Sequence, residues 1–314
     1  MYINAIGHYI PPTRIGNDYF EKVNGLTPEW IEQRTGIVTR SKCAPDENVN
    51  TMAFDAVEDA LSRCPYGEGE VDLIVASGYC IYDSVATVAH EVQRKWDITG
   101  AKAFAVTSAC SSFINGLEIV DAFFKAGMAT KALLICSEHN TYFSNDADPK
   151  CGHLWGDGAV ACCLSAERVA DSDHKVLAIM TEGLGQVGKG TGGVKLRPRE
   201  EGITMPDGRD VFLNACRYMI YALRDVLGST GLQVNDMTKL ITHQANKRIV
   251  AQVAHMLELP MERFLNNIEE LGNTGSASAA LVFSQHRDDF SKGDKVALMV
   301  FGGGYSCGAF IVEI

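Results

Sequence analysis

Short runs of apolar residues recur along the chain, and each run predicts a buried strand. Continuous apolar runs of about 4–8 residues are typical of strands that are covered on both faces. Three runs in the first half of the chain have counterparts in the second half, in the same order. The six runs cover residues 71–76, 131–136, 158–164, 238–242, 295–300 and 308–314. This repeated order predicts an internal duplication rather than two unrelated domains.

A turn of small residues opens a predicted helix in each half. In the first half, a strand over residues 103–107 leads through the turn into an apolar helix over residues 113–124. In the second half, the corresponding turn spans residues 272–278. Strands that alternate with helices in both halves predict an α/β fold of layered helices and sheets. The predicted boundary divides the chain into an N-terminal half, 1–170, and a C-terminal half, 171–314.

Composition and charge favour a globular protein and argue against membrane and nucleic-acid partners. The chain has 314 residues, of which 46% are hydrophobic, so it can build a large core. No apolar run reaches the roughly 20 residues of a membrane span, and the first residues do not resemble a signal peptide. We therefore expect a cytoplasmic protein with no membrane partner. The net charge of −11 argues against a nucleic-acid partner.

The ten cysteines include no CxxC pair and no spacing typical of a disulfide framework. In a chain of this length they are predicted to be reduced thiols. The histidines show no spacing typical of metal ligands either, so the sequence predicts no metal site.

Cys110 is the best candidate for a nucleophile among these thiols. It lies in the small-residue turn, at the predicted N-terminus of a buried helix. Unpaired N–H groups and the positive end of the helix dipole favour a thiolate at such a position. A thiolate is a good nucleophile and a good leaving group, so Cys110 can accept and later release an acyl group.

Three other elements carry polar residues or glycines at places where predicted strands end. Asn273 opens the helix that corresponds to the helix after Cys110, and His243 follows the strand over residues 238–242. Three glycines, 302–304, follow the strand that begins at residue 295. Ligands of α/β sheets gather at the loops beyond the carboxyl ends of strands. These elements are therefore predicted to converge on one site.

The ordered set of Cys110, the loop from His243 to Asn246, the turn at Asn273 and the glycines 302–304 resembles the β-ketoacyl-ACP synthase III family of the thiolase superfamily. The resemblance extends over the whole chain. It implies a thiolase-like fold, in which two duplicated halves form a layered α-β-α-β-α sandwich.

Two neighbouring branches of the superfamily are less similar to this chain. Thiolases carry a second cysteine where this chain has Val300, and elongating ketosynthases carry a second histidine where it has Asn273. Both differences favour the initiating type of ketosynthase.

The resemblance implies a decarboxylative Claisen condensation. An acyl group passes from coenzyme A to Cys110 and then condenses with malonyl-ACP as carbon dioxide leaves. The backbone N–H groups of Cys110 and Gly304 are expected to bind the tetrahedral oxyanion. His243 and Asn273 are expected to donate hydrogen bonds to the enolate that decarboxylation produces. No cofactor is expected to be bound permanently, because the coenzyme A thioester is a substrate.

The resemblance also implies binding residues outside the catalytic set. Trp30, Arg34 and Asn246 are expected to contact coenzyme A. The segment Gln244, Ala245, Asn246, Lys247 and Arg248 is expected to dock the acyl carrier protein. This segment carries few basic residues, so either docking of the carrier is weaker than in typical members or Arg209, Arg217 and Arg224 compensate.

The remaining implications concern the acyl pocket and the assembly. Val85 corresponds to a bulky aromatic gate of acetyl-specific members, so it is expected to admit a longer or branched primer; the alternative is an acetyl pocket closed by Tyr79 or Tyr82. Family members pair across a central sheet, so a homodimer is expected.

Two other functions stay open: a cysteine-dependent acyltransferase that uses a non-malonyl acceptor, and a non-catalytic partner subunit. Primary and secondary metabolism are both compatible with the sequence.

Overall fold

A computed structural model describes all residues, 1–314, and its centre is one ten-stranded mixed sheet. The order of the strands is β12-β11-β13-β14-β8-β1-β7-β6-β4-β5. The strands are β1 (Tyr2–Tyr9), β2 (Thr13–Gly16), β3 (Thr39–Lys42), β4 (Leu73–Ser77), β5 (Lys102–Val106), β6 (Lys131–His139), β7 (Asp157–Ser165), β8 (His174–Gly183), β9 (Lys195–Arg197), β10 (Gly202–Thr204), β11 (Lys239–Thr242), β12 (Phe264–Leu265), β13 (Lys295–Gly302) and β14 (Ser306–Glu313).

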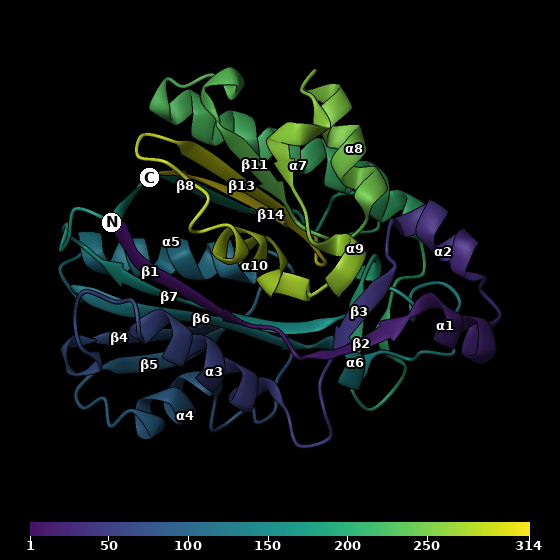
Figure 1. Ribbon diagram of the computed structural model, residues 1–314, viewed down its shortest axis with the longest axis horizontal. Helices are drawn as coiled ribbons and strands as arrows, with labels where there is room; N and C mark the ends of the chain where they lie inside the picture. The colour runs from purple at the N-terminus through teal and green to yellow at the C-terminus, as the bar shows by residue number, and fades with distance from the viewer.

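Helices cover the two outer faces of the sheet, and other helices lie between its two halves (Figure 1). The helices are α1 (Asn17–Asn24), α2 (Pro28–Thr35), α3 (Val49–Leu61), α4 (Val88–Lys95), α5 (Ser112–Lys125), α6 (Asn140–Phe143), α7 (Gly208–Thr230), α8 (Lys247–Met256), α9 (Ile268–Leu271) and α10 (Ser278–Gln285). No helix combines the length and the apolar character that crossing a bilayer requires.

The two halves of the sheet follow the same plan. From the centre outward, β1, β7, β6, β4 and β5 form one half, and β8, β14, β13, β11 and β12 form the other. In each half the three inner strands are antiparallel to their neighbours among them. The third strand and the two outer strands beyond it run parallel to one another. The strands predicted from the sequence occupy equivalent places: β4 and β11, β6 and β13, β7 and β14. The predicted boundary at 170/171 lies in the connection between β7 and β8.

Five layers result from this arrangement (Figure 1). Helices α5 and α10 lie in the middle layer, because each packs against strands of both halves. Helix α3 covers the outer face of the N-terminal strands, and α7 covers the outer face of the C-terminal strands. This order confirms the predicted α-β-α-β-α sandwich.

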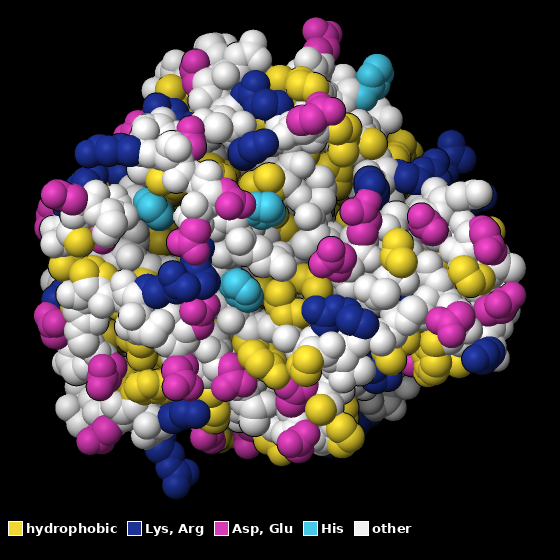
Figure 2. All heavy atoms as spheres, in the orientation of Figure 1, with side chains coloured by type: hydrophobic (Ala, Val, Ile, Leu, Met, Phe, Trp, Pro, Cys, Tyr) yellow, Lys and Arg dark blue, Asp and Glu magenta, His cyan; other side chains and the backbone are white.

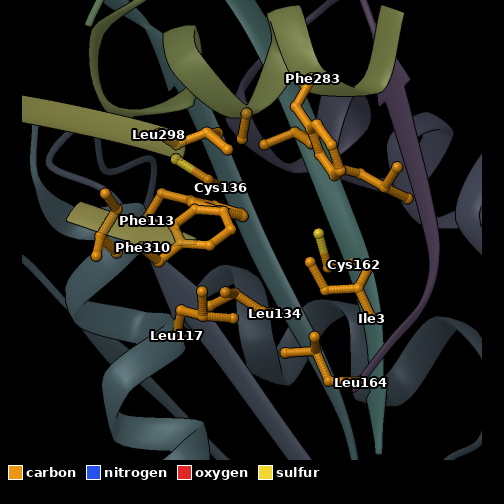
Figure 3. Close-up of a cluster of buried hydrophobic side chains, with 14 of the residues drawn as sticks. Ile3, Phe113, Leu117, Leu134, Cys136, Cys162, Leu164, Phe283, Leu298 and Phe310 are labelled. Carbon is orange, nitrogen blue, oxygen red and sulfur yellow. The ribbon is translucent and has the colours of Figure 1, made fainter. Parts of the chain in front are cut away.

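The middle layer contains the largest hydrophobic core, part of which Figure 3 shows. Phe113 on α5 packs against Phe310 on β14, with ring centroids 6.5 Å apart. Phe283 on α10 enters the same cluster together with Ile3 on β1. A side chain the size of phenylalanine contributes several kcal/mol when it is buried in such a core, about 3–5 kcal/mol by truncation. The two helices that open at the predicted site are therefore firmly anchored.

Two small two-stranded sheets complete the fold. Strands β2 and β3, which are separated in the chain by α1 and α2, form one, and the hairpin of β9 and β10 forms the second. This hairpin lies in the long connection between β8 and α7. On the face shown in Figure 2, acidic and basic side chains are interspersed.

Candidate active site

Cys110 lies in a sharp connection between strand β5 and helix α5. The residue before it, Ala109, has a positive φ of 47°, which costs a non-glycine residue about 1–3 kcal/mol. Serine side chains hold this conformation: Ser112 Oγ donates to the carbonyl of Ala109 at 2.6 Å and accepts from the N–H of Ser108 at 2.8 Å. Ser306 Oγ donates to the carbonyl of Ser108 at 3.1 Å.

The C-terminal glycines approach the backbone of this turn closely. A Cβ atom on Gly302 would lie 2.8 Å from the backbone N of Cys110, so only glycine allows the two segments to meet. The N–H of Gly303 then forms a hydrogen bond with the thiol of Cys110. Gly304, the predicted oxyanion donor, lines the cavity beside the thiol.

The protonation state of Cys110 differs from the sequence-based expectation. Burial, followed by the nearby carboxylate of Glu138, raises the pKa of the Cys110 thiol to about 12. Hydrogen bonds from Gly303, from the Tyr79 side chain and from the backbone N–H of Cys110 itself lower the pKa, but by less. The prediction that the helix end favours a thiolate in the free protein is therefore wrong, because desolvation outweighs the dipole.

Tyr79 and Glu138 are two members of the site that sequence reasoning did not assign a role beside the thiol. The Tyr79 hydroxyl oxygen lies 2.7 Å from Asn140 Oδ1 as well as beside the Cys110 thiol. Glu138 accepts from the N–H of Tyr79 at 3.1 Å and from Ser276 Oγ, so it ties the loop after β4 to the turn before α10. Gly275, at φ +61°, leaves room for the tyrosine, since a Cβ there would lie 2.4 Å from its hydroxyl.

His243 follows β11 and is held by the first residue of α10. Its Nδ1 atom lies 2.7 Å from Ser278 Oγ, which also accepts from the N–H of Gln244 at 3.2 Å. Burial lowers the pKa of His243 to about 4, so the ring is neutral at pH 7. If the serine hydroxyl donates to Nδ1, the hydrogen of the neutral ring resides on Nε2. The sequence did not identify this orienting group.

Asn273 is oriented by the turn in which it lies. Its Oδ1 atom accepts from the N–H of Gly275 at 3.0 Å. Its backbone N–H donates to the carbonyl of Leu154, and its own carbonyl accepts from the N–H of Gly156. Because the amide oxygen is engaged within the turn, the Nδ2 group is left to donate.

Cys110, His243 and Asn273 line one cavity of about 100 Å³, together with Trp155 and Asn246. A second cavity of about 360 Å³ adjoins Cys110. Cys110, His243 and Asn273 are only 8%, 5% and 4% exposed, so they lie below the surface. The structure therefore brings the three predicted catalytic residues together.

The hairpin of β9 and β10 covers the larger cavity. Leu196 and Ile203 line its wall, and Val194 lines both cavities. The connection between β8 and α7 thus lies beside Cys110 as an ordered hairpin.

The residues predicted to contact coenzyme A lie on the surface, where α2 meets α8. The guanidinium of Arg34 lies over the Trp30 ring, 5.5 Å from its centroid, and Trp30 is 39% exposed. Asn246 Nδ2 donates to the carbonyl of Arg34 at 3.0 Å. Because Asn246 also lines the cavity of Cys110, these side chains mark one route from the surface to the thiol.

Only part of the predicted carrier-docking segment is exposed for contact with a partner protein. Gln244 is fully buried: its Nε2 donates to the carbonyl of Thr242, and its Oε1 accepts from the N–H of Asn267. Gln244 therefore presents no surface to a partner, which corrects the expectation. Lys247 forms an ion pair with Glu269.

The rest of the segment differs in exposure. Arg248 is exposed and forms no ion pair with another residue of the chain, whereas Ala245 and Asn246 are half-buried. Val85, the predicted acyl-pocket residue, is 84% exposed and lines neither cavity of Cys110 in a single chain.

Comparisons with known proteins agree with this geometry. Residues 104–183 match the family described as 3-Oxoacyl-[acyl-carrier-protein (ACP)] synthase III, and residues 227–314 match its C-terminal family. A beta-ketoacyl-[acyl-carrier-protein] synthase III of Acholeplasma laidlawii is 32% identical over 99% of this chain and 98% of its own length. One of Nitratidesulfovibrio vulgaris is 34% identical over 99% and 97%.

Solved structures give the same result. The 3-oxoacyl-[acyl-carrier-protein] synthase III of Aquifex aeolicus superposes with a TM-score of 0.92 at 31% identity, covering 100% of this chain and 99% of its own. The priming beta-ketosynthase of the R1128 polyketide pathway superposes with a TM-score of 0.90 at 26% identity, covering 99% and 95%. A cysteine, a histidine and an asparagine in one cavity, on a thiolase-like fold with these relatives, show that the chain belongs to the β-ketoacyl-ACP synthase III family.

Proposed function

We propose that this chain is an acyltransferase that condenses an acyl group from coenzyme A with a malonyl unit on acyl carrier protein. The observation that carries the proposal is the shared cavity of Cys110, His243 and Asn273. This set supplies one nucleophile and two neutral side chains with a hydrogen to donate. The negatively charged enolate oxygen needs such donors, because a carboxylate in their place would repel it.

In the first half-reaction, Cys110 Sγ attacks the carbonyl carbon of the acyl-CoA thioester. The new C–S bond forms as the bond to the coenzyme A sulfur breaks, and the proton of Cys110 ends on the released coenzyme A thiol. The N–H groups of Cys110 and Gly304 bind the oxyanion, and each such donor is worth about 2.7–4 kcal/mol of barrier. The neighbouring N–H of Gly303 stabilises the sulfur as its proton leaves.

In the second half-reaction, the malonyl unit loses carbon dioxide and becomes an enolate. His243 Nε2 and Asn273 Nδ2 donate to its oxygen. The enolate carbon attacks the acyl carbon on Cys110, which releases a β-ketoacyl thioester and a thiolate, and the thiolate takes a proton from solvent. The neutral state of His243 suits this role, because the ring keeps its hydrogen and adds no charge.

The cavity of about 360 Å³ beside Cys110 is proposed to hold the acyl chain. Liquid water occupies about 30 Å³ per molecule, so the cavity exceeds the needs of an acetyl group. Leu196, Ile203 and Tyr305 supply apolar wall, and Tyr79 stands beside the thiol. A primer longer than acetyl is therefore the preferred donor. The role of Val85 requires a partner subunit, since a single chain leaves this residue at the surface.

The adenine end of coenzyme A is proposed to bind at Trp30 and Arg34, where an indole face and a guanidinium lie together. The pantetheine arm would pass Asn246 on its way to Cys110.

The acidic carrier protein is proposed to dock on α7. Arg209, Leu213, Arg217, Tyr221 and Arg224 are exposed and recur at intervals of three or four residues, so they share one face of the helix. No ion pair within the chain occupies the three arginines. Two apolar side chains between cations suit a partner that presents acidic and hydrophobic groups together.

Helix α7 packs against α8, which carries Arg248 near the entrance. The cationic face of α7 and Arg248 would thus guide the carrier towards the route that leads to Cys110. This arrangement compensates for Gln244, which is buried, and for Lys247, which is paired with Glu269.

A homodimer is proposed to form through β5, the terminal strand of the sheet. Only one edge of β5 is paired, and its sequence from Ala103 to Val106 is apolar. Unpaired strands of this kind are templates for pairing with another chain. Pairing of β5 with the same strand of a second copy would join the two ten-stranded sheets.

Incubation with a panel of acyl-CoA thioesters tests the first half-reaction. We expect an acyl mass increment on Cys110, which Cys110→Ala abolishes. Acylated protein is then offered malonyl-ACP, malonyl-CoA or small nucleophiles. Formation of a β-ketoacyl thioester and carbon dioxide supports the proposal, whereas transfer only to an alcohol or amine identifies an acyltransferase of another kind. A wild-type protein that stays unmodified by every donor would overturn the catalytic function.

A further inference from the structure

A second cluster of chemically active side chains lies away from Cys110. Cys43 follows β3, His139 ends β6 and Asp157 begins β7. Their sulfur, nitrogen and oxygen atoms all lie within 4.8 Å of one another. No sequence motif indicates this cluster, because its members are separated by many residues and converge only in the folded sheet.

We propose that Cys43, His139 and Asp157 form a binding site for a divalent transition-metal ion, of which Zn²⁺ fits best. One thiolate, one imidazole and one carboxylate form a mixed donor set that is typical of zinc. At zinc–ligand bonds of about 2.0–2.3 Å, the ligand atoms of a tetrahedral site lie about 3.3–3.8 Å apart. His139 Nε2 and Asp157 Oδ2 are already 3.8 Å apart.

The charge balance of the cluster also calls for a cation. The Asp157 side chain is fully buried, and His139 is its only basic neighbour within 4.0 Å. Buried carboxylates are normally paired with a cation or bound to a metal. A divalent ion would supply the missing charge.

The donor atoms are available and well supported. The structure gives His139 no hydrogen bond through its ring. The Cys43 thiol lies 3.4 Å from Met52 Sδ and also forms a hydrogen bond with the Asp157 side chain. Asp157 is held in place by the N–H of Cys43 at 2.9 Å and by the N–H and hydroxyl of Thr141. Supporting hydrogen bonds of this kind are usual around metal-bound carboxylates.

An ion can reach the cluster from solvent. Cys43, Glu47, His139 and Thr141 line a cavity of about 610 Å³ on the surface. Three protein ligands leave the fourth position of the metal open towards this cavity. On binding, the Cys43 thiol loses its proton to solvent, because a coordinated thiol is deprotonated. The bound ion would fix the segment after β3 to the ends of β6 and β7.

Metal titration of the full-length protein, freed of any histidine tag and treated with EDTA and a reductant, tests the site. We expect one equivalent of Zn²⁺ to bind, and Co²⁺ to give a thiolate-to-cobalt charge-transfer band in the near ultraviolet. Cys43→Ser should abolish this band, and His139→Gln should weaken binding by more than tenfold. Thr141→Val, which removes one hydrogen bond to Asp157, should weaken it by about 10- to 100-fold.

Three matched variants separate this site from other metal-binding thiols. Cys64→Ser removes another half-buried cysteine, His90→Gln removes an exposed histidine, and Cys110→Ala removes the catalytic thiol. Each should leave the stoichiometry and the cobalt band unchanged. Absence of stoichiometric binding, binding that survives both Cys43→Ser and His139→Gln, or binding that is lost in Cys110→Ala would each overturn the proposal. None of these outcomes depends on the condensation activity.

Discussion

The Nδ1 atom of His243 lies 2.7 Å from the Oγ atom of Ser278, at the start of α10. The same helix contains a matched pair outside the site, because Ser284 Oγ lies 2.8 Å from Nδ1 of His8. Both serines are buried. Helix α10 therefore orients two histidines in the same way, and only one of them lines the cavity of Cys110.

Ser278→Ala should slow condensation more than acylation. Without the hydroxyl, nothing directs the hydrogen of the neutral His243 ring to Nε2, so the enolate loses a fixed donor. A buried group left without its partner costs about 1–3 kcal/mol, and we expect a barrier increase of this size for malonyl decarboxylation. Release of carbon dioxide from labelled malonyl-ACP measures the effect. Ser284→Ala is the control, and an equal loss of activity in both variants would rule out a specific role for Ser278.

Asn273→Asp should leave acylation of Cys110 largely intact and suppress decarboxylation. The carboxylate keeps the shape of the side chain, but it cannot donate and it repels both malonate and the enolate. Loss of one oxyanion donor costs about 2.7–4 kcal/mol, so we expect decarboxylation to fall by about 10²–10³-fold. Mass spectrometry of the acyl-enzyme and release of carbon dioxide separate the two steps. The assigned role fails if both steps decline together.

Alkylation of free Cys110 by iodoacetamide should rise steeply with pH. The pKa of the thiol is raised to about 12 by burial and by Glu138. Tyr79, Gly303 and the backbone N–H of Cys110 act in the opposite direction, and Cys80, Cys136, His243 and Glu138 are the other titratable groups around the site. The thiolate fraction, and with it the rate, should increase about tenfold per pH unit between pH 7 and 9. A plateau near pH 7 would show that the thiolate already dominates in the free protein.

Tyr79→Phe should slow this alkylation at a fixed pH by about tenfold or more. A hydrogen bond to a charged group is worth about 1.5–3 kcal/mol, and its loss raises the pKa of the thiol further. Tyr82→Phe, at an exposed position, is the matched control. Identical rates in wild type and Tyr79→Phe would show that the hydroxyl serves only Asn140.

The free energy of unfolding should decrease as the pH falls from about 6.5 to about 4. Burial lowers the pKa of His153 to about 4, and the same holds for His243. Between these limits the unfolded chain binds a proton that the native ring does not, so each such histidine destabilises the fold by about 1.4 kcal/mol per pH unit. Above pH 6.5 both states are neutral and the effect vanishes.

Urea denaturation of wild type and His153→Asn over this range measures the contribution. The slope of stability against pH should be smaller by about 1.4 kcal/mol per unit in the variant, and the slopes should coincide above pH 7. Parallel slopes at low pH would contradict a depressed pKa for His153.

Ala105→Lys should weaken dimerisation. Ala105 is exposed on the terminal strand β5, and lysine on an edge strand opposes pairing with another chain. Sedimentation analysis should show the proposed dimer for the wild type and a monomer for the variant. A control substitution at the other end of the sheet, Leu265→Lys on β12, should leave the dimer intact. A dimer that persists in Ala105→Lys would exclude the β5 interface.

Much of the fold could be predicted from the sequence, because strands covered on both faces leave continuous apolar runs. The runs that became β4, β6 and β7 and their counterparts β11, β13 and β14 were found in this way. The repeated order also linked Cys110 with Asn273, since α5 and α10 occupy equivalent places. The hairpin of β9 and β10 was not predicted, because its strands are too short and polar to form such runs.

The sequence alone was enough to predict Cys110, His243 and Asn273 as site residues, because each lies in a recognisable motif and the motifs follow one another in a characteristic order. Only the tertiary structure decided their chemistry. Desolvation, which depends on burial, keeps the Cys110 thiol protonated in the free protein and His243 neutral. Contacts between residues far apart in the chain, such as that of Ser278 with His243, appear only when α10 packs against the strands that precede it in the chain, among them β11.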